Sequence, residues 1–300
     1  MVGGVSMKQK KGRKRIRFSD RLLVVINYTL CLLIAGITIY PLIYVFSMSI
    51  SRPEAVVANL VKLFPKGFSL KAYEIVFKDS AIWKALYNTI WYTVVGTLIS
   101  LSLTMLAAYP LSRKHFFLRR PLSVFFSLSM FFSGTLVPMY LLINQLGLYN
   151  TRWAIVIPGG AAAYYILMAR TFLSEIPDGL YEAARIDGAG EFTILMRIFL
   201  PLSKPIMAVL GLYYAVGQWN SYFNAMIYLP DKDLQPLQLY LMKVLVENDS
   251  IASGGTASGS LINMQLKYVV IIVALVPILC VYPFLQKYFT KGAMIGAVKE

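Results

Sequence analysis

Long runs of hydrophobic residues with almost no charge dominate the chain and set the pattern of its expected elements. A helix needs about 20 apolar residues to cross the hydrocarbon layer of a membrane. Six stretches meet this requirement: residues 22–46, 87–111, 122–146, 153–173, 205–229 and 268–289. The pattern therefore predicts an all-α integral membrane protein with six transmembrane helices.

The segments between these runs differ in character. Gly147 and Asn150 predict a tight turn between the third and fourth runs, because both residues break helices. Apolar and charged residues mix in 51–84, which predicts one or two short helices at the membrane interface. The Ser- and Gly-rich stretch 253–260 has the composition of a flexible linker.

The overall composition agrees with a membrane protein. Of the 300 residues, 58% are hydrophobic and only 14% are charged, yet the net charge is +15. Soluble domains have roughly 45–50% apolar and about 25% charged residues. Such a charge excess belongs either to positive flanks of membrane spans or to an unusual nucleic-acid-binding protein, and the placement of the charges distinguishes the two.

The charges bracket the spans. With six spans, the face that carries Met1 and Glu300 has 19 Lys and Arg, and the opposite face has 10. Each face has 7 acidic residues, so the net charges are +12 and +3. The positive-inside rule then places both termini in the cytoplasm. The excess needs no nucleic acid, and the basic stretch 8–21 precedes a run too long for a secretory signal peptide.

Side chains capable of catalysis or metal binding are scarce. Cys31 and Cys280 lie in separate apolar runs and are predicted to be buried small side chains rather than a disulfide. His115 is the single histidine, so no multi-histidine metal site can form. The chain also lacks a phosphate-binding loop of the G-x-x-x-x-G-K-[ST] type. Any energy for the protein's work must come from a partner or an ion gradient.

The loop between the fourth and fifth runs, residues 174–204, is longer than topology requires. Pro177 and Asp178 suit a helix start, and Gly188 suits the position just after its end. A second helix is expected to bury one apolar stripe at i, i+3, i+4 and i+7, made of Phe192, Leu195, Met196 and Phe199. The loop is either a solvated hairpin or a docking element in which exposed alanines let another protein approach closely.

The same loop resembles the EAA loop of binding-protein-dependent ABC importer permeases. The resemblance rests on the spacing of Glu182-Ala183-Ala184, Gly188 and Ile198-Phe199-Leu200-Pro201, without a departure. The surroundings are similar to the carbohydrate-importer branch, including the smaller permease of the maltose importer and oligosaccharide permeases. The similar pieces are residues 106–113, 200–205, 219–222 and 236–239. The likeness runs from about residue 20 to the end.

The resemblance implies a type I ABC importer permease fold and a coupling function. The short first helix of the loop would be the coupling helix, seated in a groove of an ATPase subunit. The residues implied in coupling are Glu182, Ala183, Ala184, Asp187, Gly188, Ile198, Leu200 and Pro201. The implied partners are a second homologous permease in a heterodimer, two ATPase subunits and an external solute-binding protein. This chain would hold no cofactor, since the ATPase subunits would bind ATP and Mg²⁺.

Polar residues in the fifth run indicate a substrate path. Gly217, Asn220, Ser221 and Asn224 would share one helical face at i, i+3, i+4 and i+7, with Trp219 and Tyr222 beside it. Amides that bind hydroxyls beside aromatic rings suit a sugar, and polar groups inside spans usually face a cavity or a partner helix. Packing between helices is the alternative explanation of the same residues.

Together these observations predict a multi-pass permease of the bacterial cytoplasmic membrane. Its parts would be a basic tail at 1–21, a permease domain at 22–290 with the coupling loop at 174–204, and a cytoplasmic tail at 291–300. The alternatives are a permease for a peptide or an osmolyte and a secondary transporter. The secondary transporter is disfavoured because the spans almost lack charged residues. A membrane-embedded enzyme would need clustered His, Asp or Glu, which the sequence does not place together.

Overall fold

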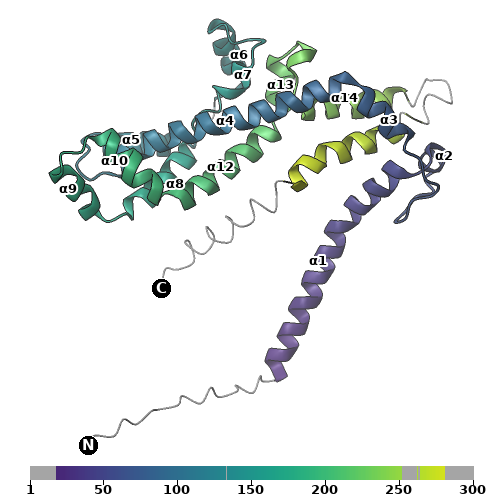
Figure 1. The fold of residues 1–300 in the computed structure, drawn as a ribbon, viewed down its shortest axis with the longest axis horizontal. Helices are drawn as coiled ribbons and strands as arrows, with labels where there is room; N and C mark the ends of the chain where they lie inside the picture. Colours follow the sequence, from purple (N-terminus) through teal and green to yellow (C-terminus); the bar gives the residue numbers. More distant parts are fainter. Residues whose placement is uncertain (1–17, 133, 252–261, 263, 281–300) are drawn as a thin grey trace, which may run out of the picture.

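The computed structural model describes residues 18–132, 134–251, 262 and 264–280 (Figure 1). In this part of the chain the regular structure is helical, apart from one isolated antiparallel bridge between Ser51 and Phe68. The greater part of the predicted basic tail, the Ser- and Gly-rich stretch 253–260 and the predicted C-terminal tail lie outside the described residues.

The helices run in a simple order along the chain. Their bounds are α1 Phe18–Ile50, α2 Pro53–Val57, α3 Lys71–Lys78, α4 Ser80–Ser112, α5 Arg119–Ser129, α6 Leu136–Gln145, α7 Trp153–Val156, α8 Ala163–Ser174, α9 Asp178–Ile186, α10 Glu191–Ile194, the π turn η1 Leu195–Phe199, α11 Leu200–Leu202, α12 Lys204–Trp219, α13 Phe223–Tyr228, the 3-10 turn η2 Lys232–Leu234 and α14 Leu237–Ile251. A last helix covers Met264–Cys280.

The first two predicted spans are confirmed as single helices, and both are longer than the sequence suggested. Among the described residues, α1 and α4 are the two helices long and apolar enough to cross a membrane. Met264–Cys280 overlaps the sixth predicted span, whose remainder, 281–289, lies outside the described residues. The two short helices expected within 51–84 are α2 and α3, while residues 80–84 begin α4.

The prediction of continuous helices over the third, fourth and fifth spans is wrong. The third span is divided into α5 and α6, the fourth into α7 and α8, and the fifth into α12 and α13. The break in the fourth span holds Pro158, Gly159 and Gly160, a proline without an N–H donor and two residues of low helix propensity. The third span breaks beside Gly134, before a new helix that contains Pro138. The apolar pattern alone could not show these breaks, because a few interrupting residues leave a long stretch predominantly apolar.

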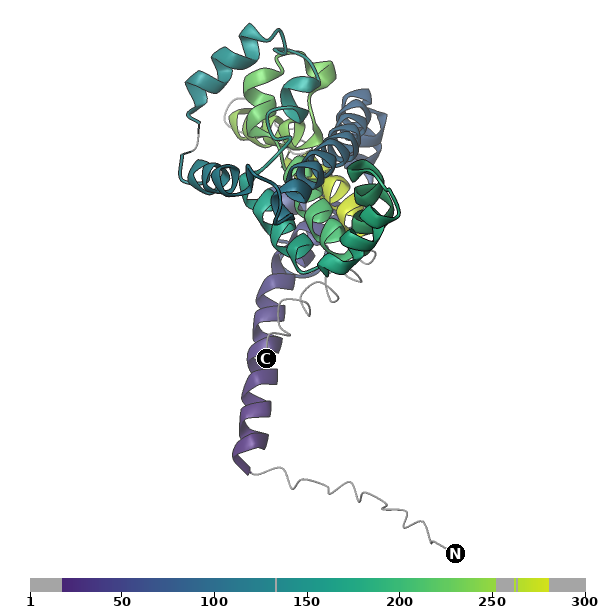
Figure 2. The ribbon, with the colours of Figure 1, turned by 90° about the vertical axis from the view of Figure 1, so that its left-hand side faces the viewer.

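The long helix α4 forms the axis of the molecule, and α8 and α12 pack along it (Figure 1). Helix α5 packs beside α4 and α8 at one end, and α3 and α14 pack on α4 at the other. Viewed from the end that carries α9, the helices α8, α10 and α12 gather around α4, while α6 extends away from them (Figure 2). These helices cover one face of α4, while side chains such as Val94, Leu98 and Leu106 on its other face remain exposed in the isolated chain.

Several connecting segments contact one another at either end of α4. At one end the 112–121 loop meets the 174–204 loop: Lys114 Nζ lies 2.7 Å from Asp178 Oδ2. At the other end Asn88 Nδ2 donates to the Asp233 carbonyl oxygen at 2.7 Å, and the Asn150 N–H donates to the Tyr228 carbonyl oxygen at 2.9 Å. The predicted turn between the third and fourth spans is confirmed, with φ of +68° at Gly147 and +57° at Asn150.

Helix α1 projects away from this body (Figures 1 and 2). Its residues 22–43 are exposed in the isolated chain, whereas its C-terminal end is buried at Ser47, Met48 and Ser49. The prediction that Cys31 and Cys280 are buried is wrong for the isolated chain, since both are exposed free thiols. An apolar helix this exposed requires lipid or another membrane protein around it.

Candidate functional site: the loop helix α9 and the broken fifth span

Helix α9 begins and ends as the sequence predicts. Pro177 occupies the N-cap position and Asp178 the first turn, where a carboxylate suits the helix dipole. At the C-terminus Gly188 has φ +79°, and its N–H donates to the Arg185 carbonyl oxygen at 3.1 Å. The Ala189 N–H donates to the Ala184 carbonyl oxygen at 2.9 Å. This pair of bonds is a Schellman motif, which satisfies carbonyls left open at the helix end.

The two faces of α9 differ sharply. Ala184 faces inward and is only 7% exposed, so the expectation of an exposed alanine pair is wrong for this residue. Glu182, Ala183, Asp187 and Gly188 are exposed. The other alanine of the pair thus remains on the surface, and the exposed face is both acidic and small enough for close approach by another protein.

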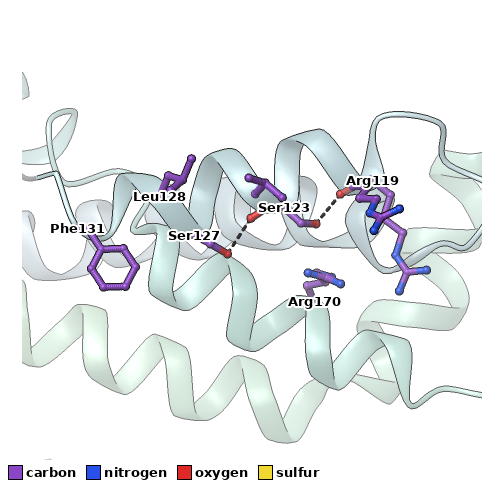
Figure 3. Close-up of a pocket in the computed structure, with 8 residues that line it drawn as sticks. Arg119, Ser123, Ser127, Leu128, Phe131 and Arg170 are labelled. Carbon is purple, nitrogen blue, oxygen red and sulfur yellow. Dashed lines mark hydrogen bonds between the residues drawn. The ribbon is translucent and has the colours of Figure 1, made fainter.

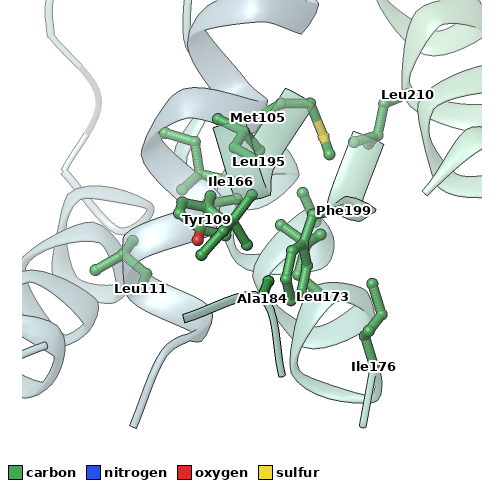
Figure 4. Packing of buried hydrophobic residues seen from close by; sticks show 13 residues of the cluster. Met105, Tyr109, Leu111, Ile166, Leu173, Ile176, Ala184, Leu195, Phe199 and Leu210 are labelled. Carbon is green, nitrogen blue, oxygen red and sulfur yellow. The ribbon is translucent and has the colours of Figure 1, made fainter. Parts of the chain in front are cut away.

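The inward face of the loop belongs to a hydrophobic core at the end of α4 (Figure 4). Side chains from α4, α8, α9, α10, η1 and α12 meet there. The core consists of Met105, Ala108, Tyr109, Leu111, Ile166, Ala169, Leu173, Ile176, Ala184, Ile194, Leu195, Phe199 and Leu210. A loop that shares the core of its spans moves with them rather than as a free hairpin.

The second part of the loop departs from the predicted apolar stripe. Residues 195–199 form a π turn, in which the backbone is wider than in an α-helix and the 3.6-residue period is lost. Leu195 and Phe199 are buried as predicted, but Phe192 is 65% and Met196 42% exposed. Ile194, absent from the predicted stripe, is fully buried.

The remaining residues of the predicted coupling set lie beside this core. Ile198 and Leu200 are partly buried and pack against it, while Pro201 is exposed. Of the eight residues implied by the resemblance, five are therefore on the surface. The other three, Ala184, Ile198 and Leu200, pack in or against the core.

A buried arginine ties the loop to α4. Arg113, the C-cap residue of α4, is 7% exposed and donates through Nη2 to the Leu173 carbonyl oxygen at 2.8 Å. Its guanidinium carbon lies 4.3 Å from the centre of the Phe199 ring, and Nη1 lies 3.8 Å from Asp178 Oδ1. Burial lowers the pKa of Arg113, because desolvation penalises the charged form, whereas a hydrogen bond from Lys114 lowers the pKa of Asp178 and favours its carboxylate.

A second polar link joins α4, α9 and α10 through Glu191. The hydroxyl groups of Tyr109 and Tyr181 donate to its two carboxylate oxygens at 2.8 Å and 2.7 Å. Arg185 Nη1 lies 3.7 Å from the same carboxylate. The hydrogen bond to Glu191 raises the pKa of Tyr181, with burial as a second cause. Tyr109, Tyr181 and Glu191 border a cavity of about 520 Å³ between the end of α4 and the loop.

The predicted polar stripe of the fifth span does not lie on one helical face. Helix α12 ends at Trp219, and Asn220, Ser221 and Tyr222 form the break before α13. The Asn220 side chain donates from Nδ2 to the Val216 carbonyl oxygen at 2.9 Å, and such local bonds compete with helix propagation.

The exposure of the predicted path residues varies across the break. Among them, Gly217, Asn220, Tyr222 and Asn224 are exposed, and Trp219 and Ser221 are partly buried. The structure thus brings most of the predicted path residues to a helix break rather than to a continuous stripe.

Gln218, outside that stripe, faces the protein interior. A Cβ atom added to Gly96 of α4 would lie 2.9 Å from Gln218 Cδ, so the two helices approach closely there. The break in the fourth span lies alongside. The Tyr214 hydroxyl accepts a hydrogen bond from the Ala162 N–H at 3.3 Å, and the Ser100 hydroxyl donates to the Gly159 carbonyl oxygen at 3.4 Å. Side chains from α4 and α12 thus satisfy backbone groups that the break leaves free.

The described residues contain no group of three or more His, Cys, Asp or Glu side chains that could hold a metal ion. The contacts described around α9 and the helix breaks are hydrogen bonds, ion pairs and apolar packing.

Comparison with known proteins agrees with this arrangement. Residues 100–295 match the family described as "Binding-protein-dependent transport system inner membrane component". The protein LplC of Bacillus subtilis (strain 168) is 38% identical over 268 residues, which cover 89% of this chain and 91% of LplC. The chain belongs to this family. It is therefore a permease subunit of a binding-protein-dependent ABC transporter, a transport subunit integral to the membrane.

Other relatives of the permease extend over almost its whole length. The polygalacturonan/rhamnogalacturonan transport system permease protein YtcP of Bacillus subtilis (strain 168) is 37% identical and covers 93% of this chain and 99% of its own. A crystal structure of a bacterial ABC transporter involved in the import of the acidic polysaccharide alginate has a chain with TM-score 0.83 and 34% identity. That match covers 91% of this permease and 98% of the other chain.

The sequence alone does not identify the residues that hold the permease loop in place. In the sequence Arg113 is noticed only as part of segment 106–113, which resembles carbohydrate importers, and Glu191 only as part of the loop 174–204. One signal points to Arg113: it ends an apolar run, where a cation suits the helix dipole and can reach the carbonyls of a neighbouring helix. No signal in the sequence points to the contact between Gln218 and Gly96, because it depends on which helix packs against α12 and where that helix has a glycine.

We expect Gly96→Leu to destabilise the permease by about 1–3 kcal/mol, because the added side chain overlaps Gln218. Adding Gln218→Ala in the same chain makes room and should recover most of the loss. Thermal unfolding of the purified complex measures both changes. The matched control is Gly211→Ala, whose Cβ would meet Leu101 at 3.8 Å, an ordinary contact. If the double variant stays as unstable as Gly96→Leu, the loss of stability does not come from overlap with Gln218.

Proposed function

We propose that the cargo of this permease is a sugar or an oligosaccharide, delivered by an external solute-binding protein. The main support is the similarity to YtcP, 37% identical over 93% of the chain, whose name refers to polygalacturonan and rhamnogalacturonan. Relatives named for melibiose, raffinose and stachyose and for arabinooligosaccharides point to the same class of cargo. A peptide or osmolyte cargo is the alternative that a transport assay tests directly.

The proposed assembly follows from the family. This chain forms one half of the translocation pore in the bacterial cytoplasmic membrane, and a second homologous permease forms the other half. Six spans place both termini in the cytoplasm, where two ATPase subunits bind ATP and Mg²⁺. The exposed apolar helix α1 supports insertion in the membrane, and the grouping of the connecting segments at two ends of α4 supports the alternating topology.

We assign the coupling contact to the exposed face of α9. Glu182 and Asp187 offer carboxylates, Ala183 permits close packing, and Ile186, which is 87% exposed, adds an apolar contact. Arg113 and Glu191 link this helix to α4. Closure of the ATPase subunits would therefore move α9 together with the end of α4, a rigid-body transition that opens the pore on the other side.

The substrate path is assigned to the break between α12 and α13. Non-helical backbone at membrane depth is stable only where it is covered by protein or lines a water-filled cavity. Asn220 and Asn224 are exposed at this break, and the buried indole N–H of Trp219 has no hydrogen-bond partner among the described residues. The exposed amides can bind sugar hydroxyls, and the exposed ring of Tyr222 can stack on a sugar face.

The test is uptake and ATPase activity of the reconstituted importer with its binding protein. A uronic-acid oligosaccharide and a neutral oligosaccharide are offered in parallel with a peptide and an osmolyte. We expect ATPase stimulation by an oligosaccharide and about two- to tenfold less stimulation in Trp219→Ala, which removes an aromatic contact worth about 0.5–1.5 kcal/mol. The control is Trp83→Ala, because Trp83 lies at the start of α4 and donates to the Phe77 carbonyl oxygen. Stimulation by the peptide or the osmolyte alone would reject the sugar assignment.

A further inference from the structure

A groove between α5 and α8 carries chemistry that the transport function does not use (Figure 3). Its volume is about 420 Å³. It is polar at one end and apolar at the other, and its lining residues are Arg119, Arg120, Ser123, Val124, Ser127, Leu128, Phe131 and Arg170. In Figure 3, Arg170 of α8 lies across the groove from the α5 residues Arg119 and Ser123.

The three arginines have no anionic partner within the described part of the chain. Arg119 and Arg170 are partly buried, and Arg120 is exposed. Arg113 and Arg185, by contrast, lie within 4 Å of a carboxylate. Three guanidinium groups at one end of a groove create a strong positive potential, which favours an anion with several oxygen acceptors.

The hydroxyl groups of the groove do not add to this attraction for a polar ligand. Ser123 donates to the Arg119 carbonyl oxygen and Ser127 donates to the Ser123 carbonyl oxygen. Both donors are therefore engaged within α5. The guanidinium groups are the polar groups that remain free to bind a ligand in this groove.

The rest of the groove is apolar and runs along α5. Val124 is 53%, Leu128 54% and Phe131 83% exposed. A helix rises about 1.5 Å per residue, so the path along α5 from Arg119 to Leu128 spans about 14 Å, and Phe131 follows just beyond the helix end. This length carries a ligand from the headgroup level of a membrane well into one leaflet of its hydrocarbon layer.

We propose that this groove binds an anionic phospholipid of the cytoplasmic leaflet. The phosphate contacts Arg119, Arg120 and Arg170, and one acyl chain lies along Val124, Leu128 and Phe131. Basic pockets between membrane helices on the cytoplasmic side attract anionic headgroups for the same electrostatic reason. The inference depends on the cytoplasmic placement of the 112–121 loop, and it is independent of the nature of the cargo.

An acidic cargo is the competing occupant, because it would offer the same negative charge. The apolar lining favours the lipid. An oligosaccharide needs hydrogen-bond partners along its whole length, whereas here the polar groups stand at one end of an apolar path. An acyl chain needs only apolar surface along that path.

The test uses the assembled importer reconstituted in vesicles of phosphatidylcholine and phosphatidylglycerol, then extracted and analysed by native mass spectrometry. We expect the wild-type complex to retain phosphatidylglycerol selectively. Arg119→Gln with Arg170→Gln should lower this retention roughly tenfold or more, since two of the three positive groups at the headgroup end are removed. The matched control is Arg197→Gln with Lys204→Gln, which removes two exposed positive charges outside the groove.

Three results would overturn the proposal. Unchanged phosphatidylglycerol retention in the Arg119/Arg170 variant is the first, and an equal loss in the control variant is the second. The third is intact lipid retention with lost stimulation by a uronic-acid oligosaccharide, which would assign the groove to the cargo.

A thiol-labelling experiment tests the orientation separately. The variant His115→Cys, in a background with Cys31→Ser and Cys280→Ser, is treated with a membrane-impermeant thiol reagent. Labelling from the outside of intact cells would place the loop, and with it the groove, on the opposite face.

Discussion

Replacing Gly188 with proline is expected to abolish transport while the chain still inserts and assembles. Gly188 has φ +79°, whereas proline is held near −65°. Proline also removes the N–H that donates to the Arg185 carbonyl oxygen at 3.1 Å. The end of α9 cannot then close, at a local cost of about 3 kcal/mol or more. If α9 is the coupling helix, uptake should fall at least about a hundredfold, because 1.4 kcal/mol corresponds to a factor of ten.

Gly188→Asn is the matched control for this prediction. Nothing lies within 4 Å of a Cβ at this position, so a side chain is tolerated sterically. Asparagine also populates the left-handed region more readily than most residues and keeps the N–H. We expect this variant to keep most of the uptake. Equal loss in both variants, measured with correctly inserted complex, would mean that the surface at Gly188 matters and its backbone conformation does not. Normal uptake in Gly188→Pro would remove α9 from the coupling path.

Replacing Arg113 with leucine is expected to release the loop from α4. The guanidinium group is buried, donates to the Leu173 carbonyl oxygen at 2.8 Å and lies over the Phe199 ring. Without it the carbonyl group loses its buried donor and the core beneath α9 loses a well-packed cation. Leaving the Leu173 carbonyl oxygen without its donor costs about 1–3 kcal/mol, and Asp178, which is half exposed, keeps its contact with Lys114. The expected results are a lower unfolding temperature of the complex and ATPase activity that no longer responds to cargo.

Trypsin cleavage at Arg185 gives a local measurement of the same effect, because this residue lies in the last turn of α9. Cleavage should accelerate in Arg113→Leu as the loop opens more often. Lys114→Ala is the control: Lys114 also contacts Asp178, at 2.7 Å, but its side chain is 71% exposed. Exposed ion pairs contribute little, so the control should cleave like the wild type. Equal protection of Arg185 in all three proteins would show that Arg113 does not hold the loop.

The local features of the loop were predictable because they depend on few neighbouring residues. The start of α9 at Pro177 and Asp178 and its end at Gly188 follow from capping chemistry within one helical turn. The grouping of the connecting segments at two ends follows from the alternation of apolar runs. Properties that depend on the next few residues, or on the composition of a long run, can be read without knowing the neighbours in space.

The helix interruptions and the inward contacts were not predictable in this way. The π turn at 195–199 shifts the buried face from Phe192 and Met196 to Ile194. The break before α8 is stabilised by partners elsewhere in the chain, the hydroxyl groups of Tyr214 and Ser100. A pattern with a fixed 3.6-residue period assumes regular backbone, and it fails where tertiary contacts make irregular backbone stable.

The family resemblance, the membrane character and the caps of α9 could be read from composition and short spacing. The inward orientation of Ala184, the anchoring of the loop to α4 by Arg113 and Glu191, and the contact of Gln218 with Gly96 could be seen only in the folded chain. These contacts join residues far apart along the chain. Their formation depends on how the helices pack, and no periodicity within one helix encodes that packing.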